Sequence, residues 1–214
     1  AFNWISGYLS RDSVYVAPNT ERTTKDLEIV FPDRIGKILY LPNLYDCGRL
    51  PSITPMSLSV VDISCFGSIR IMKNHLTQAI AAIEFANRRG SKLRFHINAT
   101  RAEGYSADNI LKNLRAIFKA SPNHELVEHE WLSQKDFKEL IKKMDIGMQV
   151  SFTETFNMVS ADMVTQGIPI VGPSAIRWLS ASCIVQDETD SRDIVRVLEK
   201  VSRFKKSCVN DSYD

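Results

Sequence analysis

From residue 58 onward, the hydrophobic positions of this chain alternate between two periods. Short apolar runs, of which Leu58–Gly67 is the first, have the length and composition of buried strands. Between them lie longer segments whose apolar residues recur at helical spacing, as in Asn74–Arg89, which Gly90 terminates. Strands that alternate with helices are typical of a parallel sheet covered on both faces. The pattern therefore predicts a doubly wound, Rossmann-like α/β sheet of about six strands.

The same reasoning places the other elements of this region. We expect Leu76, Ile80, Ile83 and Ala86 to form the apolar stripe of the first helix. The segment Lys205–Asp214 has the composition of a frayed polar tail. The remaining predictions are a strand at Lys92–Ile97, a helix capped by Ser106, a strand at Glu125–Val127, a helix that Ser133 caps, a strand at Ile146–Val150, a short helix at Ala175–Leu179, a strand at Cys183–Val185, and a helix from Asp190 or Ser191 to about Phe204.

Residues 1–55 are less regular. The pattern predicts a short strand at Ser13–Val16, a helix over Thr24–Phe31 that Pro32 stops, and a buried strand at Lys37–Leu41. The Pro-rich segment Leu50–Pro55 has the composition of a linker.

Composition limits the class of protein. With 214 residues, 44% hydrophobic and 24% charged, the chain is expected to be an ordinary soluble globular protein. A net charge of +2 and interspersed charges do not indicate nucleic-acid binding. The four cysteines have no C-x-x-C spacing, and we find neither a signal peptide nor an apolar run long enough to span a membrane. We therefore expect a reducing, cytoplasmic setting.

One segment carries two isolated acids. Glu154 lies in the loop that follows the expected strand Ile146–Val150, and Asp162 follows eight residues later, in the expected helix that ends before Gly167. Eight residues make about two turns at ~3.6 residues per turn, so both carboxylates can face the same ligand. Asp162 is the only charge between Glu154 and Ile176. Because burying an unpaired carboxylate costs several kcal/mol, Asp162 needs a partner.

This segment resembles the acid-x7-acid signature of the group-1 (family-4-like) GT-B glycosyltransferases. The usual form is Glu-Gly-Phe-Gly-x4-Glu, followed by Gly-x-Pro-Val-Val. In this chain Thr155 and Asn157 replace the glycines, and Asp162 replaces the second Glu. Asn tolerates a left-handed backbone, and Asp is one methylene shorter, so the ribose must sit closer. The resemblance implies three roles: Glu154 contacts the transferred sugar, the amides of Thr155, Phe156 and Asn157 hold the donor diphosphate, and Asp162 binds the ribose hydroxyls.

The loop after the first expected strand carries two cations. Arg70 and Lys73 follow Gly67 and precede the expected helix Asn74–Arg89. Cations are mildly unfavourable at a helix N-terminus, so their presence favours a bound anion. The loop resembles the family's Gly-Arg-x4-Lys-Gly element, whose Arg and Lys clamp the donor pyrophosphate. Lys73 falls six residues after Gly67, as in that element, whereas Ser68 occupies the usual Arg position and Arg70 stands two residues later.

Each of these features also has a purely structural interpretation. Glu154 can be an acid favoured by the helix dipole, the Gly-x-Pro sequence is common after helices, and the two loop cations can be solvated. At the end of the second expected strand, His96 and Asn98 can contact a ligand, and a satisfied structural histidine is equally consistent with the sequence. No zinc-binding spacing and no G-x-S-x-G sequence occurs, so we expect neither a metal site nor a hydrolase elbow.

The order of these motifs, over roughly Ser59–Phe204, resembles the donor-binding C-terminal half of a GT-B glycosyltransferase. The resemblance implies a retaining transfer of a sugar from a nucleotide diphosphate sugar to an unidentified glycan, lipid or small-molecule acceptor. It also implies that Arg70, Lys73 and the amides of residues 155–157 stabilise the leaving diphosphate, so that neither a metal nor another cofactor is required.

The resemblance also divides the chain. Residues 56–214 are expected to form the donor-binding domain, and residues 1–55 an N-terminal segment and linker that remains from, or leads in from, an acceptor domain. About 55 residues cannot form an acceptor domain of the usual size. Two hypotheses follow: either the chain is part of an enzyme with an upstream acceptor domain, or it is a stand-alone or split-enzyme module that binds a sugar nucleotide without activity of its own.

Overall fold

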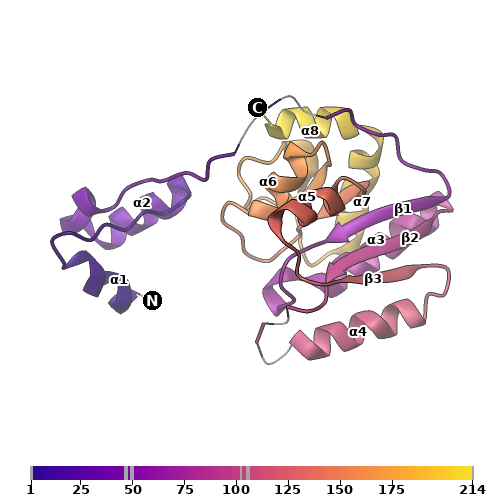
Figure 1. Ribbon diagram of the computed structural model, residues 1–214, viewed down its shortest axis with the longest axis horizontal. Helices are drawn as coiled ribbons and strands as arrows, with labels where there is room; N and C mark the ends of the chain where they lie inside the picture. The colour runs from indigo at the N-terminus through magenta and orange to yellow at the C-terminus, as the bar shows by residue number, and fades with distance from the viewer. Residues whose placement is uncertain (1, 46–47, 49–50, 102, 105–106, 214) are drawn as a thin grey trace. The chain divides into compact units, whose positions relative to one another are not determined.

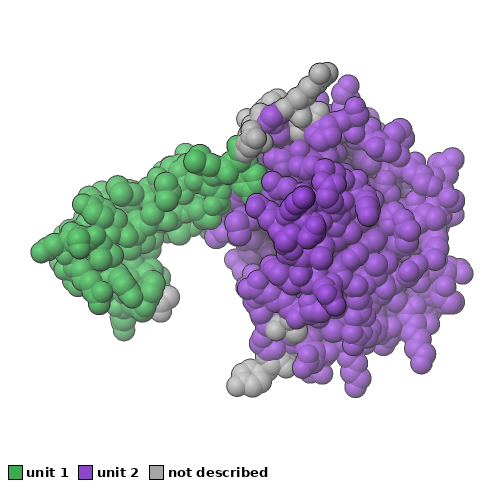
Figure 2. All heavy atoms as spheres, in the orientation of Figure 1, with its two compact units in different colours: residues 1–46 green, residues 47–214 purple. Residues whose placement is uncertain are grey.

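The structure is a computed structural model, and it describes residues 2–45, 48, 51–101, 103–104 and 107–213. The chain forms two compact units, Ala1–Asp46 and Cys47–Asp214, which are coloured separately in Figure 2. Of the Pro-rich stretch expected to be a linker, residues 51–55 belong to the second unit, where Ile53 packs against the core. Residue 50 lies outside the described residues. No helix in the described part of the chain is both long enough and apolar enough to cross a membrane.

The second unit is built on a six-stranded sheet in the order β3-β2-β1-β4-β5-β6. All five strand pairings are parallel, which confirms the predicted doubly wound, Rossmann-like fold. The order reverses at β1, which pairs with β2 on one side and with β4 on the other. The strands are β1 (Val60–Cys65), β2 (Lys92–Asn98), β3 (Glu125–His129), β4 (Ile146–Met148), β5 (Ile170–Pro173) and β6 (Ile184–Val185).

Helices flank the sheet (Figure 1). Right-handed crossovers place the helices between β1 and β3 on one face and those between β3 and β5 on the other, because the strand order runs in opposite directions on the two sides of β1. The helices of this unit are η2 (Ile71–Lys73), α3 (His75–Arg89), α4 (Ala107–Lys119), α5 (Gln134–Ile141), α6 (Met158–Thr165), η3 (Ala181–Cys183), α7 (Ser191–Arg203) and α8 (Lys205–Tyr213).

Caps account for several helix ends. Ser133 and Asp190 lie at the N-caps of α5 and α7, as predicted, and their side chains accept hydrogen bonds from main-chain N–H groups of the first turn. Gly90 ends α3 with a left-handed backbone. The N-cap predicted at Ser106 lies outside the described residues.

Three local predictions for the second unit are wrong. Ala175–Leu179 forms turns rather than a helix. The segment predicted to be a frayed tail forms α8, because Cys208 and Val209 are buried in the core. In α3, Ile80 is 49% exposed, and the buried face is made mainly of alanines together with Phe85. Small residues let this helix approach the sheet closely, and apolar periodicity alone did not reveal that.

The first unit has a small core of its own, formed by Leu9, Leu27 and Ile38. The two strands predicted at Ser13–Val16 and Lys37–Leu41 do not form in full. Only one parallel bridge joins the two segments, between Val16 and Ile38, and Leu41 is exposed rather than buried. The elements are α1 (Phe2–Leu9), α2 (Glu21–Val30), which ends before Pro32 as predicted, and η1 (Pro32–Lys37).

A close contact at Gly147 sets the position of α6 over the sheet. A Cβ atom at Gly147 would lie 2.4 Å from Cδ1 of Ile170 and 2.5 Å from Sδ of Met163. Glycine is therefore what allows α6, and the loop that precedes it, to pack directly on β4.

We expect Gly147→Ala to lower the free energy of unfolding of the second unit by about 1–3 kcal/mol, because the added methyl overpacks the β4–α6 contact. Urea denaturation followed by circular dichroism measures the change. Gly48→Ala is the matched control, since no atom lies within 4 Å of a Cβ at that position. Equal stability of the Gly147 and Gly48 variants would contradict the prediction.

Candidate functional site

The candidate site lies at the carboxyl ends of β1 and β4, where the strand order of the sheet reverses. In open parallel sheets, ligands bind in the crevice outside the strand ends at this switch point. Two loops enter it: residues 66–74 after β1 and residues 149–157 after β4. They are the two loops that carry the basic and the acidic motif of the sequence.

The structure joins the two motifs through an ion pair. Nζ of Lys73 donates a hydrogen bond to Oε1 of Glu154, and the two side chains are only 13% and 10% exposed. The main chains of the loops also meet, because the N–H of Phe152 donates to the carbonyl of Met72 at 3.0 Å. The predicted diphosphate-binding cation and the predicted catalytic acid therefore share one crevice.

A buried glutamine braces both loops. Nε2 of Gln78, on α3, donates to the carbonyl of Lys73 at 2.7 Å, and its Oε1 accepts from the N–H of Val150 at 2.9 Å. Asn74, which adopts a left-handed backbone before α3, donates from Nδ2 to the carbonyl of Glu188 at 2.7 Å. These bonds fix the main chain on either side of the ion pair.

Asn157 starts α6 from a left-handed conformation, with φ 57°. Its Oδ1 accepts from the N–H of Ser160 at 2.9 Å, and its Nδ2 donates to Oε1 of Gln149 at 3.2 Å. Nε2 of Gln149 in turn donates to the carbonyl of Phe66 at 2.8 Å, which ties this loop back to the end of β1. Asn157 thus adopts a left-handed backbone, which glycine tolerates most readily, and also caps the helix.

Thr155 and Phe156 form the turn between Glu154 and Asn157. The indole Nε1 of Trp178 donates to the carbonyl of Phe156 at 2.7 Å, and the two rings lie 5.7 Å apart. Thr155 is exposed, and its main-chain N–H has no hydrogen-bond acceptor among the described residues. An N–H group beside a helix N-terminus is available to a bound anion.

The side chains of the other residues in the basic loop do not join the Lys73–Glu154 ion pair. Gly67 has φ 117°, and its N–H donates to Oδ1 of Asn98 at 2.9 Å. Arg70 is half exposed and pairs with Glu103, with Nη1 and Oε2 3.7 Å apart, and Glu103 also accepts from Arg101 at 2.8 Å. The carbonyl of Arg70 accepts from the N–H of Lys73 at 3.0 Å, but within the described residues the Arg70 side chain forms no hydrogen bond or ion pair with Lys73 or Glu154.

Asp162 occupies α6 one turn beyond its start and is half-buried. Burial raises the pKa of its carboxyl group, and the positive charge of Lys138 on α5 opposes the shift. Its carboxylate has no hydrogen bond or ion pair in the part of the chain that the structure describes, and it is not brought into contact with Lys73 or Glu154. The predicted ribose ligand is therefore a carboxylate without a protein partner.

Other buried polar groups line the same end of the sheet. His75 begins α3 directly after the Lys73 loop, and neither of its ring nitrogens has a partner within the described residues. Burial and the nearby charge of Lys73 lower the pKa of His75 to about 4, so the ring is neutral near pH 7. The hydroxyls of Ser151 and Ser160 are likewise buried without a partner among those residues.

His96 has a structural role. Its Nε2 lies 2.8 Å from Oδ1 of Asp62, and its Nδ1 lies 2.9 Å from Nε2 of His129. Asp62 also accepts two hydrogen bonds from Arg94, at 2.7 and 2.6 Å. The structural interpretation of His96, which the sequence left open, is therefore the one that the geometry favours.

Four residues that hold the two loops in place were not predicted from the sequence, namely Gln78, Gln149, Asn74 and Trp178. One signal could have identified Gln149, which is an uncharged polar residue inside the expected buried strand Ile146–Val150, whereas the predicted apolar stripe of α3 placed Gln78 on the polar face. A buried amide must find hydrogen-bond partners, and these two find them in the neighbouring loops.

Chemically, the crevice combines an ammonium group, a carboxylate and main-chain N–H groups at a helix N-terminus. An ammonium group and main-chain N–H groups can hold a phosphate, and a carboxylate can accept hydrogen bonds from hydroxyl groups. Among the described residues, no group of three or more His, Cys, Asp or Glu side chains could hold a metal ion.

Solved structures share this fold. No family model and no curated protein matches the sequence. The chain is similar to the C-terminal domain of a glycosyl transferase group 1 family protein (LpcC) from Francisella tularensis, with a TM-score of 0.62 and 16% identity over 75% of this chain and 84% of that chain. It is also similar to the pneumococcal O-GlcNAc transferase GtfA, solved with UDP and GlcNAc, with a TM-score of 0.62 and 16% identity.

A third similar structure is S. aureus TarM, solved as a mutant with UDP and other ligands, with a TM-score of 0.64 and 13% identity. The matches to GtfA and TarM cover 93% and 92% of this chain. Each match therefore extends beyond the Cys47–Asp214 unit. The chain spans 40% of the length of each of these two proteins. The second unit therefore has the fold of the C-terminal domain of a group-1 GT-B glycosyltransferase.

We expect Lys73→Met to destabilise the second unit by about 3–5 kcal/mol, because it leaves the nearly buried Glu154 carboxylate unpaired. The double variant Lys73→Met/Glu154→Gln should be more stable than Lys73→Met, since it removes both charges. Urea denaturation of the single and double variants measures the coupling between the two side chains.

The control is the exposed pair of Arg115 and Glu128, whose nitrogen–oxygen distances are 2.7 and 2.6 Å. Arg115→Met should cost only about 0–1 kcal/mol, because solvent screens this pair. Simple additivity of the Lys73 and Glu154 substitutions would show that the two side chains do not interact in solution.

Proposed function

We propose that this chain is the donor-binding part of a retaining glycosyltransferase, which transfers a sugar from a nucleotide diphosphate sugar to an acceptor. The observation that carries the proposal is the Lys73–Glu154 pair, which lies at the switch point of the sheet beside the N-terminus of α6. A cation and an acid that are held together away from solvent are suited to a ligand that carries a diphosphate next to a hydroxylated sugar.

In the proposed mechanism, the donor diphosphate replaces Glu154 as the partner of Lys73. As the glycosidic bond breaks, negative charge develops on the leaving diphosphate. The Lys73 ammonium and the N–H groups of residues 155–157 stabilise that charge, and they are preorganised by the Gln78 and Asn157 hydrogen bonds. The released Glu154 carboxylate then accepts hydrogen bonds from the sugar and positions it. Arg70 would join the diphosphate by giving up its exposed partner, Glu103.

The ribose would be held by Asp162. Its carboxylate is half-buried and lacks a protein partner in the described region, and burial raises its pKa, so hydroxyl donors would relieve an unfavourable desolvation. Two ribose hydroxyls can supply such donors. The raised pKa also implies that nucleotide affinity falls as pH is lowered toward the pKa of Asp162, because a protonated carboxyl accepts more weakly.

The comparisons support UDP as the first nucleotide to test, since GtfA and TarM were solved with it. The acceptor, whether a glycan, a lipid or a small molecule, would bind to residues outside this crevice, in an upstream acceptor domain. The alternative function is a sugar-nucleotide-binding module without turnover of its own. Both hypotheses predict nucleotide binding, and they differ in whether a longer protein that includes an acceptor domain transfers the sugar.

Calorimetry with UDP, GDP and ADP tests the proposal. We expect Asp162→Asn to weaken binding of the free nucleotide by about 1.5–3 kcal/mol, which is roughly ten- to a hundredfold, because a charge-assisted bond to the ribose is lost. Glu154→Gln should not weaken free-nucleotide binding, since its proposed ligand is the sugar and the loss of its charge frees Lys73 for the diphosphate.

Glu139→Gln is the matched control, because it removes one negative charge from the exposed surface of α5, outside the crevice. Melting temperatures of all variants separate a stability effect from a binding effect. The proposal is wrong if none of the three nucleotides binds at millimolar concentration. A loss of stability at Asp162 without loss of affinity would assign that residue a structural role.

A further inference from the structure

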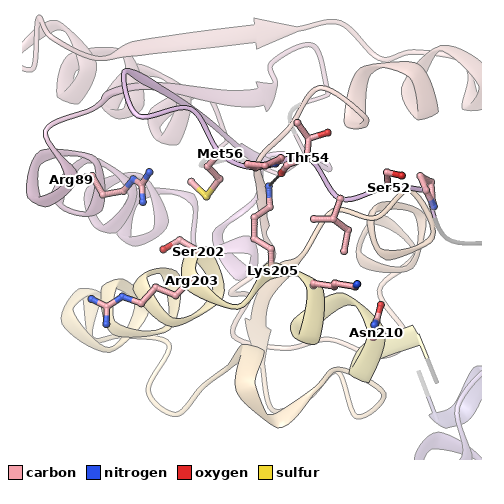
Figure 3. A pocket seen from close by; sticks show the side chains of 12 residues that line it. Ser52, Thr54, Met56, Arg89, Ser202, Arg203, Lys205 and Asn210 are labelled. Carbon is pink, nitrogen blue, oxygen red and sulfur yellow. Dashed lines mark hydrogen bonds between the residues drawn. The ribbon is translucent and has the colours of Figure 1, made fainter.

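A polar cavity lies in the Cys47–Asp214 unit, near the amino ends of β1 and β2 and thus at the end of these strands opposite to the crevice. It has a volume of about 770 Å³ and is shown in Figure 3. α3 separates the two sites: His75 begins this helix beside Lys73, and Arg89 ends it at the cavity. A helix of 15 residues spans roughly 20 Å at ~1.5 Å per residue, so the two sites are distinct.

The charged lining of this cavity has a single sign. Four of its twelve lining residues are cations, and none is an acid. Neutral hydrogen-bonding groups complete the polar lining, including Ser52, Thr54 and Asn210. The cations come from three helices, and they are Arg89 of α3, Arg203 of α7, and Lys205 and Lys206 of α8.

Lys205 is the fixed member of this set. Its side chain is buried, and its Nζ donates to the carbonyl of Thr54 at 3.0 Å (Figure 3). The same Nζ lies 3.6 Å from Oδ1 of Asp145. Burial lowers the pKa of this amine, and Asp145 opposes the shift. Lys205 therefore anchors the segment before β1 to the start of α8 and shapes the cavity.

The other three cations have hydrogen-bond donors without an acceptor among the described residues. Arg203 and Lys206 are exposed and have no ion pair or hydrogen bond from their side chains within the described residues. The guanidinium of Arg89 makes one long hydrogen bond, from Nη2 to the carbonyl of Ser57 at 3.4 Å. Its Nε is buried and has no partner in that part of the chain. In Figure 3, the guanidinium of Arg89 points into the cavity.

Helix dipoles explain only part of this arrangement. Arg89 and Arg203 are the last residues of α3 and α7, where cations are favourable. Lys205 and Lys206 are the first residues of α8, where cations are unfavourable. Lys205 is paired with Asp145, whereas the charge of Lys206 is uncompensated at this unfavourable position in the described part of the chain, and a bound anion would remove that cost.

We propose that this cavity binds a small molecule that carries a phosphate or diphosphate group, at a site separate from the donor crevice. Its volume lies within the range of about 300–1,000 Å³ that is typical of small-molecule sites. Arg89, Arg203 and Lys206 contact the phosphate oxygens, and Ser52, Thr54 and Asn210 provide neutral hydrogen bonds to the rest of the ligand. The proposal does not rest on the function proposed for the crevice.

Inorganic pyrophosphate is the probe, titrated into the 214-residue chain and followed by amide NMR. Amide NMR resolves the two sites, so that binding at the crevice and binding at the cavity are followed separately in one titration. We expect saturable shifts at the amides of Thr54, Arg89, Ser202 and Lys206. The double variant Arg203→Gln/Lys206→Gln should lower this affinity at least about tenfold, because two charge-assisted contacts are lost.

Lys112→Gln/Lys119→Gln is the matched control, since it removes two exposed lysines from α4 and changes the net charge by the same amount. It should leave the affinity of the cavity nearly unchanged. Shifts confined to the crevice loops, or equal losses in the two double variants, would overturn the proposal. The shifts that UDP causes at the amides of the crevice loops should be the same in Arg203→Gln/Lys206→Gln as in the unmodified chain, so failure here is distinguishable from failure of the crevice assignment.

Discussion

The parallel pairing of β1 with β4 is the constraint on which the candidate site depends. These strands are far apart in the chain, and reciprocal hydrogen bonds join them where β4 begins. The N–H of Asp145 donates to the carbonyl of Asp62 at 2.8 Å, and the N–H of Asp62 donates to Oδ2 of Asp145 at 3.0 Å. Once the two strands are adjacent, the loops that follow them must meet. The nearly buried pair of Lys73 and Glu154 is the consequence of that meeting.

Side-chain amides supply much of the rigidity of the crevice. Gln78, Gln149 and Asn157 each bond to groups on two different segments, so the loops are held by hydrogen bonds that cross between β1, β4 and the helices. Buried amides of this kind are stable only when fully satisfied, which makes their partners interdependent. Arg70 and Thr155 are exposed and take no part in these amide hydrogen bonds.

Much of this fold could be predicted from the sequence, because strand and helix periods are local signals. The alternation after Leu58 predicted the parallel sheet, and strand order placed both motifs at one edge. The packing of α8 and the buried face of α3 could not be predicted, since Cys208 and the alanines become core residues only through tertiary contacts. The bonds of Gln78 and Gln149 were equally hidden, because a sequence does not state which distant carbonyl a buried amide reaches. The pairing of Arg70 with Glu103 could not be predicted either, because it depends on the path of a loop, and loops have no periodic sequence pattern.

The most direct test of this account is the NMR signal of the Lys73 ammonium group, observed in protein with ¹⁵N-labelled lysine while UDP is added. We expect the signal to shift on saturation and to become coupled to phosphorus, because the diphosphate replaces Glu154 as the partner of Nζ. The signals of Lys112 and Lys119, on the exposed face of α4, should stay in place. Bound UDP that leaves the Lys73 signal unchanged would contradict the assignment of this crevice as the diphosphate site.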